Sequence, residues 1–331
     1  MGRQRRAKET CSKITGGRTI MKKLGNIAVV LVVAAVLPAM SIASSAENPM
    51  RVTTEENIIS IHKDQSALLR YRYWEVPFKP CVQELFSPDG INILRDSPAD
   101  HKHHHALMYA VSADGVNFWE EQKEPGHQIH KAFTEVRVHY HNEAPCGGFT
   151  EQLGWVNPKT TQLMLDESRT IEACQLSDFK ATILYWESKF SVPSGKDSVT
   201  LSGSHYFGLG MRFVESMDVA GQFRNAEGKT GESVRGDEQL VRANWCAFTA
   251  VAEGKLVTVA MFGHPDNLRD PTQWFTMTKP FAYLSATLNL HREPLTIVPD
   301  KPLRLRYAVA LWDGRVDNSL IDRTYRWWIA D

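Results

Sequence analysis

Short runs of alternating or β-branched residues recur along almost the whole chain, and they constrain the fold more than any other feature. Such runs are typical of half-buried β-strands, because successive strand side chains point to opposite faces of a sheet. Turn signals such as Pro88-Asp89-Gly90 separate them. The clearest runs are residues 57–62, 67–74, 133–141, 181–190, 198–202, 256–262 and 303–312. We therefore expect an all-β fold, a large and mostly antiparallel β-sandwich.

Helical patterns are scarce. The sequence favours short helices in two places, Ser204–Met211 and Asn318–Ile329, and in the second the apolar residues recur on one face. Residues 221–236 are rich in glycine and charge and predict a long surface loop, whose length makes it a candidate functional segment. Because no change in composition divides residues 47–331, we expect a single domain there.

The N-terminal segment has the features of an export signal. Met21-Lys22-Lys23 precedes the apolar run Ile27–Leu37, and the small residues Ser44-Ser45-Ala46 suit cleavage. The apolar run is much shorter than the roughly 20 residues that a membrane-spanning helix needs. We therefore expect Met21 to be the true start, residues 1–46 to be removed as a signal peptide, and the mature chain to be periplasmic or secreted.

The charge of the chain after cleavage argues against some partners. Without residues 1–46, 30 Lys and Arg stand against 37 Asp and Glu, a formal charge of −7. An acidic chain disfavours non-specific binding to nucleic acid. The later apolar runs, such as residues 256–262, are far too short to span a bilayer. We predict no nucleic-acid partner and no membrane span in the mature chain.

Four cysteines remain after cleavage: Cys81, Cys146, Cys174 and Cys246. In an exported chain they permit two disulfides in any of three pairings. Buried free thiols are the alternative, because a chain with a core this large does not depend on disulfides.

Four of the twelve histidines fall within five positions, at His101, His103, His104 and His105. If this segment is extended, His101, His103 and His105 share one face and could form part of a divalent-metal site. The alternative is a polar loop whose histidines bond backbone groups. His103 and His104 are candidate acid–base residues, because the unperturbed pKa of imidazole lies near neutrality.

Further candidates lie around this cluster and at a second histidine. His264 is a third candidate catalytic residue, because it follows a strongly apolar strand, and functional residues often sit where a strand meets a loop. Arginine can hold sugar oxygens in its planar fork. The candidate substrate-binding residues are Arg95, Asp100, Trp119, Arg212 and Asn267, although an aromatic such as Trp119 can equally belong to the core.

Five motifs together resemble the PmoA-like bacterial domain family: Asp100–His104, Asp114–Trp119, Glu167–Thr170, Gly210–Arg212 and Gly263–Asn267. The resemblance covers most of residues 55–315. The chain differs from the family pattern in having Lys102 where a proline is usual and His105 where an arginine is typical. The resemblance implies a secreted β-sandwich protein associated with the degradation of complex sugars, and a galactose-mutarotase-like supersandwich is one form of such a fold.

The methane-oxygenase label of that family does not suit this chain. The methane monooxygenase subunit of the same name is an integral membrane protein, whereas the chain has no segment of spanning length after its signal. We reject methane oxidation.

The leading functional hypothesis is an exported enzyme that acts on a sugar or glycoside by hydrolase, lyase or epimerase chemistry. His103, His104 and His264 would supply acid–base groups. A second hypothesis makes the histidine cluster a divalent-metal site, with the metal as cofactor. A third is a non-catalytic protein that only binds carbohydrate.

The signal-peptide hypothesis predicts a defined mature N-terminus. Protein recovered from the periplasm or medium of an expressing bacterium should begin at Glu47, directly after the small residues that suit cleavage. Mass spectrometry of the N-terminal peptide measures this. Recovery of the chain with an intact Met1 or Met21 in the membrane fraction would contradict it.

Overall fold

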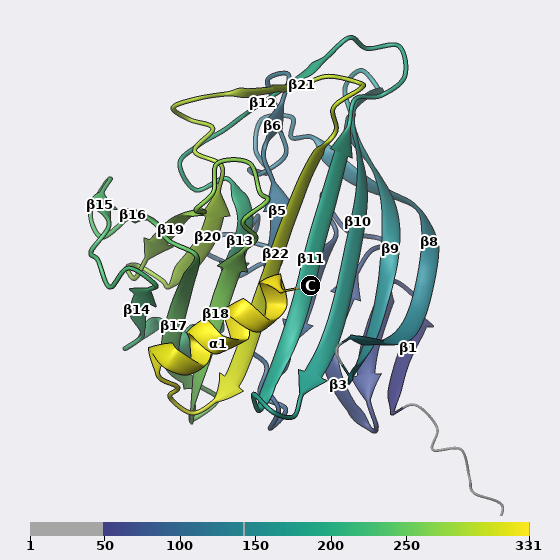
Figure 1. Ribbon diagram of the computed structural model, residues 1–331. Coiled ribbons are helices and arrows are strands. Elements are labelled where there is room, and N and C mark those ends of the chain that lie inside the picture. Colours follow the sequence, from purple (N-terminus) through teal and green to yellow (C-terminus); the bar gives the residue numbers. More distant parts are fainter. Residues whose placement is uncertain (1–48, 142, 331) are drawn as a thin grey trace, which may run out of the picture. The chain divides into compact units, whose positions relative to one another are not determined.

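The computed structural model describes residues 49–141 and 143–330, and three sheets form their framework (Figure 1). The prediction of an all-β, mostly antiparallel fold is confirmed, because neighbouring strands pair antiparallel in all three sheets. The predicted signal peptide, residues 1–46 with Met21, lies outside the described residues. Within those residues, no helix has the length and apolar character needed to cross a membrane.

The largest sheet has ten strands and the second has eight. The ten-stranded sheet consists, in spatial order, of β1 (Met50–Glu55), β2 (Ile58–Lys63), β3 (Ser66–Arg72), β4 (Cys81–Leu85), β5 (Leu107–Ala110), β13 (Gly208–Arg212), β20 (Tyr283–Thr287), β19 (Gln273–Met277), β16 (Gln239–Arg242) and β15 (Glu232–Ser233). The eight-stranded sheet consists of β14 (Gln222–Asn225), β17 (Trp245–Ala252), β18 (Lys255–Gly263), β22 (Leu303–Asp313), β11 (Ala181–Ser191), β10 (Gln162–Leu176), β9 (Ala144–Asn157) and β8 (His127–His141).

A small sheet and two helices complete the fold. The third sheet has the order β21 (Leu295–Ile297), β12 (Val199–Ser202), β6 (Ser112–Ala113) and β7 (Val116–Asn117). A single 3-10 turn, η1, covers Glu215–Asp218, and the helix α1 covers Asn318–Ile329. The α1 prediction is therefore confirmed.

The two large sheets pack face to face. Tyr71 of β3 lies 5.1 Å from Phe149 of β9 between ring centroids, and Tyr109 of β5 lies 5.1 Å from Phe190 of β11. These residues belong to one continuous cluster of buried apolar side chains from both sheets. Burial of this interface supplies the main driving force for folding, since the free energy gained scales with the apolar area removed from water.

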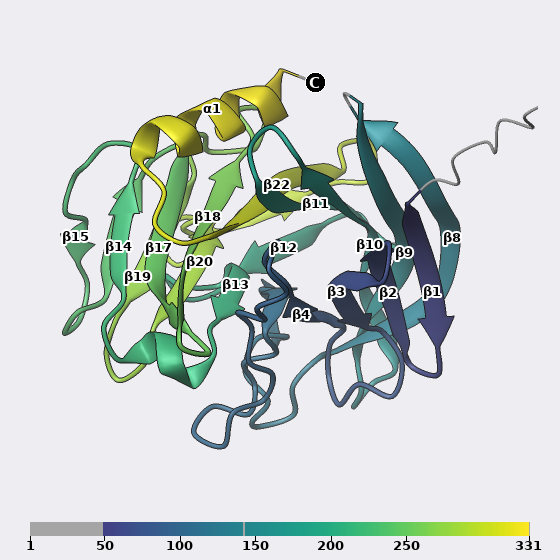
Figure 2. The same cartoon turned by 90° about the horizontal axis from the view of Figure 1, so that it is seen from below.

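Part of the outer face of the eight-stranded sheet, around β17, β18 and β22, is covered by α1 (Figures 1 and 2). The N-cap residue Asp317 accepts a hydrogen bond from the backbone N–H of Leu320, which satisfies a free donor of the first turn. Trp328 then packs against Phe262 of β18, and the Trp245 indole donates to Asp322 at 2.7 Å. A second apolar cluster thus closes the face that would otherwise be exposed.

Two local predictions were wrong. Ser204–Met211 is not a helix: residues 208–212 form β13, which is hydrogen-bonded to β5 on one side and β20 on the other. Pairing on both edges overrides the weak helical pattern. Residues 221–236 are not an unbroken loop, because they contain β14 and β15.

The cysteines form one disulfide. Cys146 of β9 and Cys174 of β10 face each other in register and are bonded, whereas Cys81 and Cys246 are buried free thiols. The sequence left open whether the cysteines form disulfides or remain free thiols. The structure shows one disulfide and two buried free thiols.

A buried arginine connects the two large sheets. Arg169 of β10 has no solvent exposure, and its guanidinium forms two hydrogen bonds with Glu167, at 2.9 and 2.8 Å. The same group donates to the Tyr71 hydroxyl of β3 at 2.8 Å, to the backbone carbonyl of Pro80 at 3.3 Å, and to Gln128 at 3.0 Å. Burial disfavours its charge, yet the adjacent Glu167 carboxylate holds the pKa of Arg169 above its usual value.

The partners of Arg169 are themselves satisfied. Glu167 also accepts from Trp155 at 2.8 Å and from Ser188 at 2.6 Å. The Tyr71 hydroxyl donates onward to Glu151, which is bonded to Nδ1 of His130 at 2.7 Å. A buried charge is tolerated only when its hydrogen-bonding groups are occupied, and here the guanidinium meets this condition.

Replacing Arg169 should therefore be costly. Arg169→Ala leaves Glu167 buried without its cation, and we expect it to lower the free energy of unfolding by about 3–5 kcal/mol. Urea denaturation followed by tryptophan fluorescence measures the change. The matched control is Arg304→Ala, which removes a bidentate pair with Glu187 at the exposed surface and should cost only about 0–1 kcal/mol. Equal losses in the two variants would contradict the role assigned to Arg169.

Candidate active site

The histidine cluster opens onto a cavity of about 450 Å³ beside the ten-stranded sheet. Imidazole, carboxylate, aromatic and cationic side chains share its wall. The imidazoles are His101, His103 and His104; the carboxylates are Glu120, Asp237 and Glu238; the aromatics are Tyr206, Phe275, Phe281 and Tyr283; the cations are Arg235 and Lys279. Such a mixture of aromatic surface and a few polar groups is typical of a small-molecule site.

The cluster is a turn rather than a strand. The backbone N–H of His101 donates to Pro98 at 3.0 Å, and that of His104 donates to His101 at 2.9 Å. The rings of His101, His103 and His104 consequently gather, with centroids 4.5–5.6 Å apart. The predicted shared face of His101, His103 and His105 is wrong, because a turn does not keep the period of two on which that prediction rested.

His105 points away from the other three. Its Nδ1 is bonded to Asp96 at 2.8 Å and its Nε2 to Glu121 at 2.6 Å, and Lys79 also donates to Glu121 at 2.7 Å. Burial opposes a charge on the ring, but the two carboxylates raise the pKa of His105 above its ordinary value. The two carboxylates thus favour the protonated form of His105, which lies outside the cavity lining.

His104 has the opposite environment. Burial, followed by the neighbouring charges of His103 and His101, lowers its pKa to about 2. Its ring stacks on His101 at 4.9 Å and lies 4.8 Å from Tyr283, and its Nδ1 has no hydrogen-bond partner among the described residues. The pKa of His103 is also lowered, by burial and by the charge of Lys79. Both rings are therefore neutral near pH 7, and His104 resists protonation the more strongly of the two because it is the more deeply buried.

Arg212 and Asp100 contact residues of the cavity wall. The guanidinium of Arg212 lies over the ring of Phe281 at 3.6 Å and contacts Asp100 at 3.3 Å and Asp218 at 3.7 Å. Asp100 is also bonded to Nδ1 of His101 at 3.2 Å. The structure therefore brings these two predicted residues next to the histidine cluster, although neither lines the cavity itself.

The structure does not bring the remaining predicted residues into this cavity. Trp119 has no solvent exposure and stacks on Phe207 at 5.1 Å, so it belongs to the core. Arg95 pairs with Glu215 at 3.3 Å and lines a second hollow.

His264 and Asn267 lie at a different part of the fold. His264, after β18, packs against Trp328 of α1, and Asn267 exchanges hydrogen bonds with the backbone of Arg306 at 2.7 Å. His264, which we expected to supply acid–base chemistry together with His103 and His104, is therefore absent from the lining of their cavity. Many turns without a functional role also begin directly after an apolar strand, so this position alone does not identify a functional residue.

Several cavity residues were not predicted from the sequence. Tyr206 donates to Glu120 at 3.3 Å, and burial followed by that carboxylate raises the pKa of Tyr206 to about 12. Glu238 accepts from His205 at 3.0 Å and from Arg235 at 2.6 Å. The only available sequence signal was the predicted functional segment 221–236, whose last residues, Arg235 and Gly236, do line the cavity.

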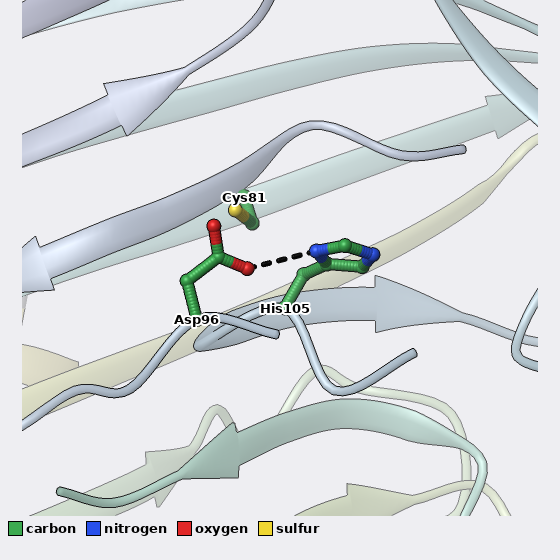
Figure 3. A group of neighbouring side chains, drawn as sticks. All are labelled: Cys81, Asp96 and His105. Atoms are coloured by element: carbon green, nitrogen blue, oxygen red, sulfur yellow. Dashed lines mark hydrogen bonds and ion pairs between the residues drawn. The ribbon is translucent and has the colours of Figure 1, made fainter. Parts of the chain in front are cut away.

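One group of side chains in residues 49–141 and 143–330 has the spacing of a metal site. Cys81, Asp96 and His105 bring one possible ligand atom each within 4.8 Å of one another (Figure 3). This set replaces the predicted three-histidine set, with which it shares only His105.

Comparison with family models identifies the family of this chain. Residues 59–326 match DUF6807, which is described as a family of unknown function. The chain belongs to this family. No curated protein matches the sequence.

Solved structures show distant likenesses. An alpha-galactosidase from Lactobacillus brevis shares 8% identity over 81% of this chain and 40% of its own, with a TM-score of 0.40. A galactose mutarotase related enzyme from Lactobacillus acidophilus shares 7% identity over 81% of this chain and 98% of its own, with a TM-score of 0.36.

A galactose mutarotase-like protein from Clostridium acetobutylicum shares 10% identity over 80% of this chain and 98% of its own, with a TM-score of 0.41. The chain thus spans about 40% of the length of the galactosidase and nearly all of the two mutarotase-like proteins.

The neutral, buried ring of His104 predicts a pH effect on stability. Its pKa is about 2 in the folded protein, whereas an exposed histidine has a pKa of 6.5, so the unfolded chain binds a proton at a higher pH than the folded one. Stability should fall as pH drops below 6.5, by up to about 1.4 kcal/mol per pH unit from this residue. His104→Phe keeps a stacking ring but cannot titrate, and it should flatten the stability curve between pH 7 and 5. Urea denaturation at each pH measures this, and an unchanged slope would contradict the assignment.

Proposed function

We propose that the protein is an exported enzyme that processes a carbohydrate in the cavity lined by His101, His103 and His104, through proton transfer. The observation that carries the proposal is the grouping of three imidazoles on the wall of a cavity that also presents aromatic rings and carboxylates. Hydrolases, lyases and epimerases of sugars share this need for a positioned base and acid.

The lining suits a sugar. The apolar C–H face of a pyranose can pack on Phe281, Phe275 or Tyr283, and its hydroxyls can bond to Glu120, Asp237 or Glu238. Several carboxylates are held in place by neighbours, such as Glu238 by Arg235 and His205, so they present acceptors in fixed positions. Preorganised groups of this kind reduce the entropy lost on binding.

We assign His103 as the base. It is less buried than His104, lines the cavity, and has a lowered pKa, so it is neutral and able to accept a proton near pH 7. The Tyr206–Glu120 pair, which also lines the cavity, carries the proton that can be returned to the substrate. His104 positions the other two rings through its stacking contacts.

Export belongs to the same proposal. The Cys146–Cys174 disulfide supports it, because disulfides persist in oxidising compartments such as the periplasm and are rare in the cytosol. The resemblance to the PmoA-like family remains a prediction that agrees with a sugar-degrading setting.

The test is a comparison of three variants with the wild type on a panel of carbohydrates. Free aldoses followed by NMR report anomer or epimer exchange, nitrophenyl glycosides report hydrolysis, and uronate polysaccharides report elimination. On whichever probe the wild type turns over, His103→Gln should lower kcat by about 10²–10⁴-fold, the typical contribution of one acid–base group. His62→Gln, at a partly buried histidine of β2 far along the sheet, is the matched control and should retain activity.

His264→Gln separates the two possible locations of the site. A loss of turnover with His264→Gln and none with His103→Gln would refute the proposal. Binding of a probe that His103→Gln weakens, with no turnover by any protein, would make the chain a carbohydrate-binding protein instead.

A further inference from the structure

We propose that Cys81, Asp96 and His105 form a zinc site, separate from the carbohydrate cavity and independent of the function proposed above. Their ligating atoms, the Cys81 sulfur, a carboxylate oxygen and a ring nitrogen, lie within 4.8 Å of one another (Figure 3). Thiolate, imidazole and carboxylate are the three ligand types that Zn²⁺ takes from proteins.

The backbone holds the three ligands in fixed positions. Cys81 opens β4, and Asp96 pairs with His105 through an isolated antiparallel bridge just before β5. The backbone N–H of Ser97 donates to the carbonyl of His104 at 2.9 Å and extends this pairing. Because Val82 of β4 pairs with Leu107 of β5, the elements that carry the three ligands are neighbours in one sheet. Sites carried by rigid elements keep their geometry better than sites on loops.

The outer contacts of the group match those of a metal-bound histidine. A histidine that binds a metal through one nitrogen almost always donates its other N–H to a carboxylate, a backbone carbonyl or water. Here Nε2 of His105 is bonded to Glu121 at 2.6 Å, and Glu121 is fixed by Lys79 at 2.7 Å. Nδ1 is therefore the nitrogen that faces Asp96 and Cys81.

Hydrogen bonds also fix the carboxylate of Asp96. One of its oxygens accepts from Gln83 at 3.1 Å and the other from Ser97 at 2.8 Å. A tetrahedral Zn²⁺ would separate its ligand atoms by about 3.3–3.8 Å, given usual zinc–ligand bonds. Binding therefore requires the Asp96 oxygen and Nδ1 of His105, now 2.8 Å apart, to move apart slightly, while any pair near the 4.8 Å limit moves closer by roughly 1 Å.

The site also has a path to solvent. Cys81 and His105 are 1% and 3% exposed, but Asp96 lines a wide hollow of about 900 Å³. The acids Glu55, Glu56, Glu84 and Asp96 outnumber the two arginines, Arg70 and Arg95, in the lining of this hollow, and this excess of negative charge favours the approach of a cation. A water molecule from this hollow could supply the fourth ligand.

The test uses Co²⁺ as a spectroscopic substitute for zinc on the purified full-length protein after treatment with a chelator. The wild type should bind one Co²⁺ or Zn²⁺ per chain and show the near-ultraviolet charge-transfer band of a cobalt–thiolate bond. Cys81→Ala should lose the band. Cys246→Ala is the matched control, because Cys246 is an equally buried free thiol outside the metal-competent group, and it should keep the band.

A second measurement guards against misfolding of Cys81→Ala. Glu121→Gln leaves all three ligands in place but removes the carboxylate behind His105, and it should weaken zinc binding about 10–100-fold in competition with a chelating dye. The proposal is overturned if the wild type retains no more zinc than the buffer contains, if Cys81→Ala keeps the cobalt band, or if Glu121→Gln binds zinc as tightly as the wild type.

Discussion

The structure depends on one buried ion pair between Arg169 and Glu167. Two large sheets could slide past each other on apolar contacts alone, because burial of apolar area has no preferred direction. The guanidinium of Arg169 adds direction: it binds Glu167 on its own strand and Tyr71 on the opposite sheet. Each bond must be made in the folded state, since an unpaired charge in this core would cost several kcal/mol. The pair therefore selects one relative position of the sheets, and every site built on them inherits that position.

The candidate active site is built on the same ten-stranded sheet, beside strands β5, β13 and β20. β13 lies between β5 and β20, and a side chain at Gly210 would collide with the Tyr283 hydroxyl and the Trp119 ring. Because Gly210 has no Cβ, the side chain of Tyr283 can lie against the backbone of β13. The ring of His104 then packs on the Tyr283 ring at 4.8 Å. The turn that gathers the histidines is thus supported by an aromatic layer that belongs to the core. Trp119, which the sequence suggested as a ligand contact, contributes through this layer instead.

Strands and the helix could be predicted because their signals are local and periodic. Alternation in β11 and β22 and the apolar face of α1 are visible in a few consecutive residues. The site could be predicted only in part, because it depends on turns. Ser97 and Ala106 adopt positive φ angles of 48° and 50°, which few non-glycine residues do, and they redirect the chain on either side of the histidines. Neither residue type indicates such a conformation in advance. The partners Phe281 and Tyr283 lie far away in sequence and carry no motif that links them to the cluster, and Glu120 lies just outside the Asp114–Trp119 motif.

Adjacent histidines show how strongly surroundings control imidazole chemistry. His104 and His105 are consecutive and similarly buried, yet burial and two neighbouring imidazoles lower the pKa of the first, while two carboxylates raise the pKa of the second. The difference follows from direction alone, because the backbone turn sends one ring toward the cavity and the other toward Asp96 and Glu121. Histidines that are neighbours in the sequence therefore need not belong to the same site. In this chain the histidine cluster divides into three rings gathered at the cavity and a single ring fixed between the carboxylates of Asp96 and Glu121, where we place the zinc site.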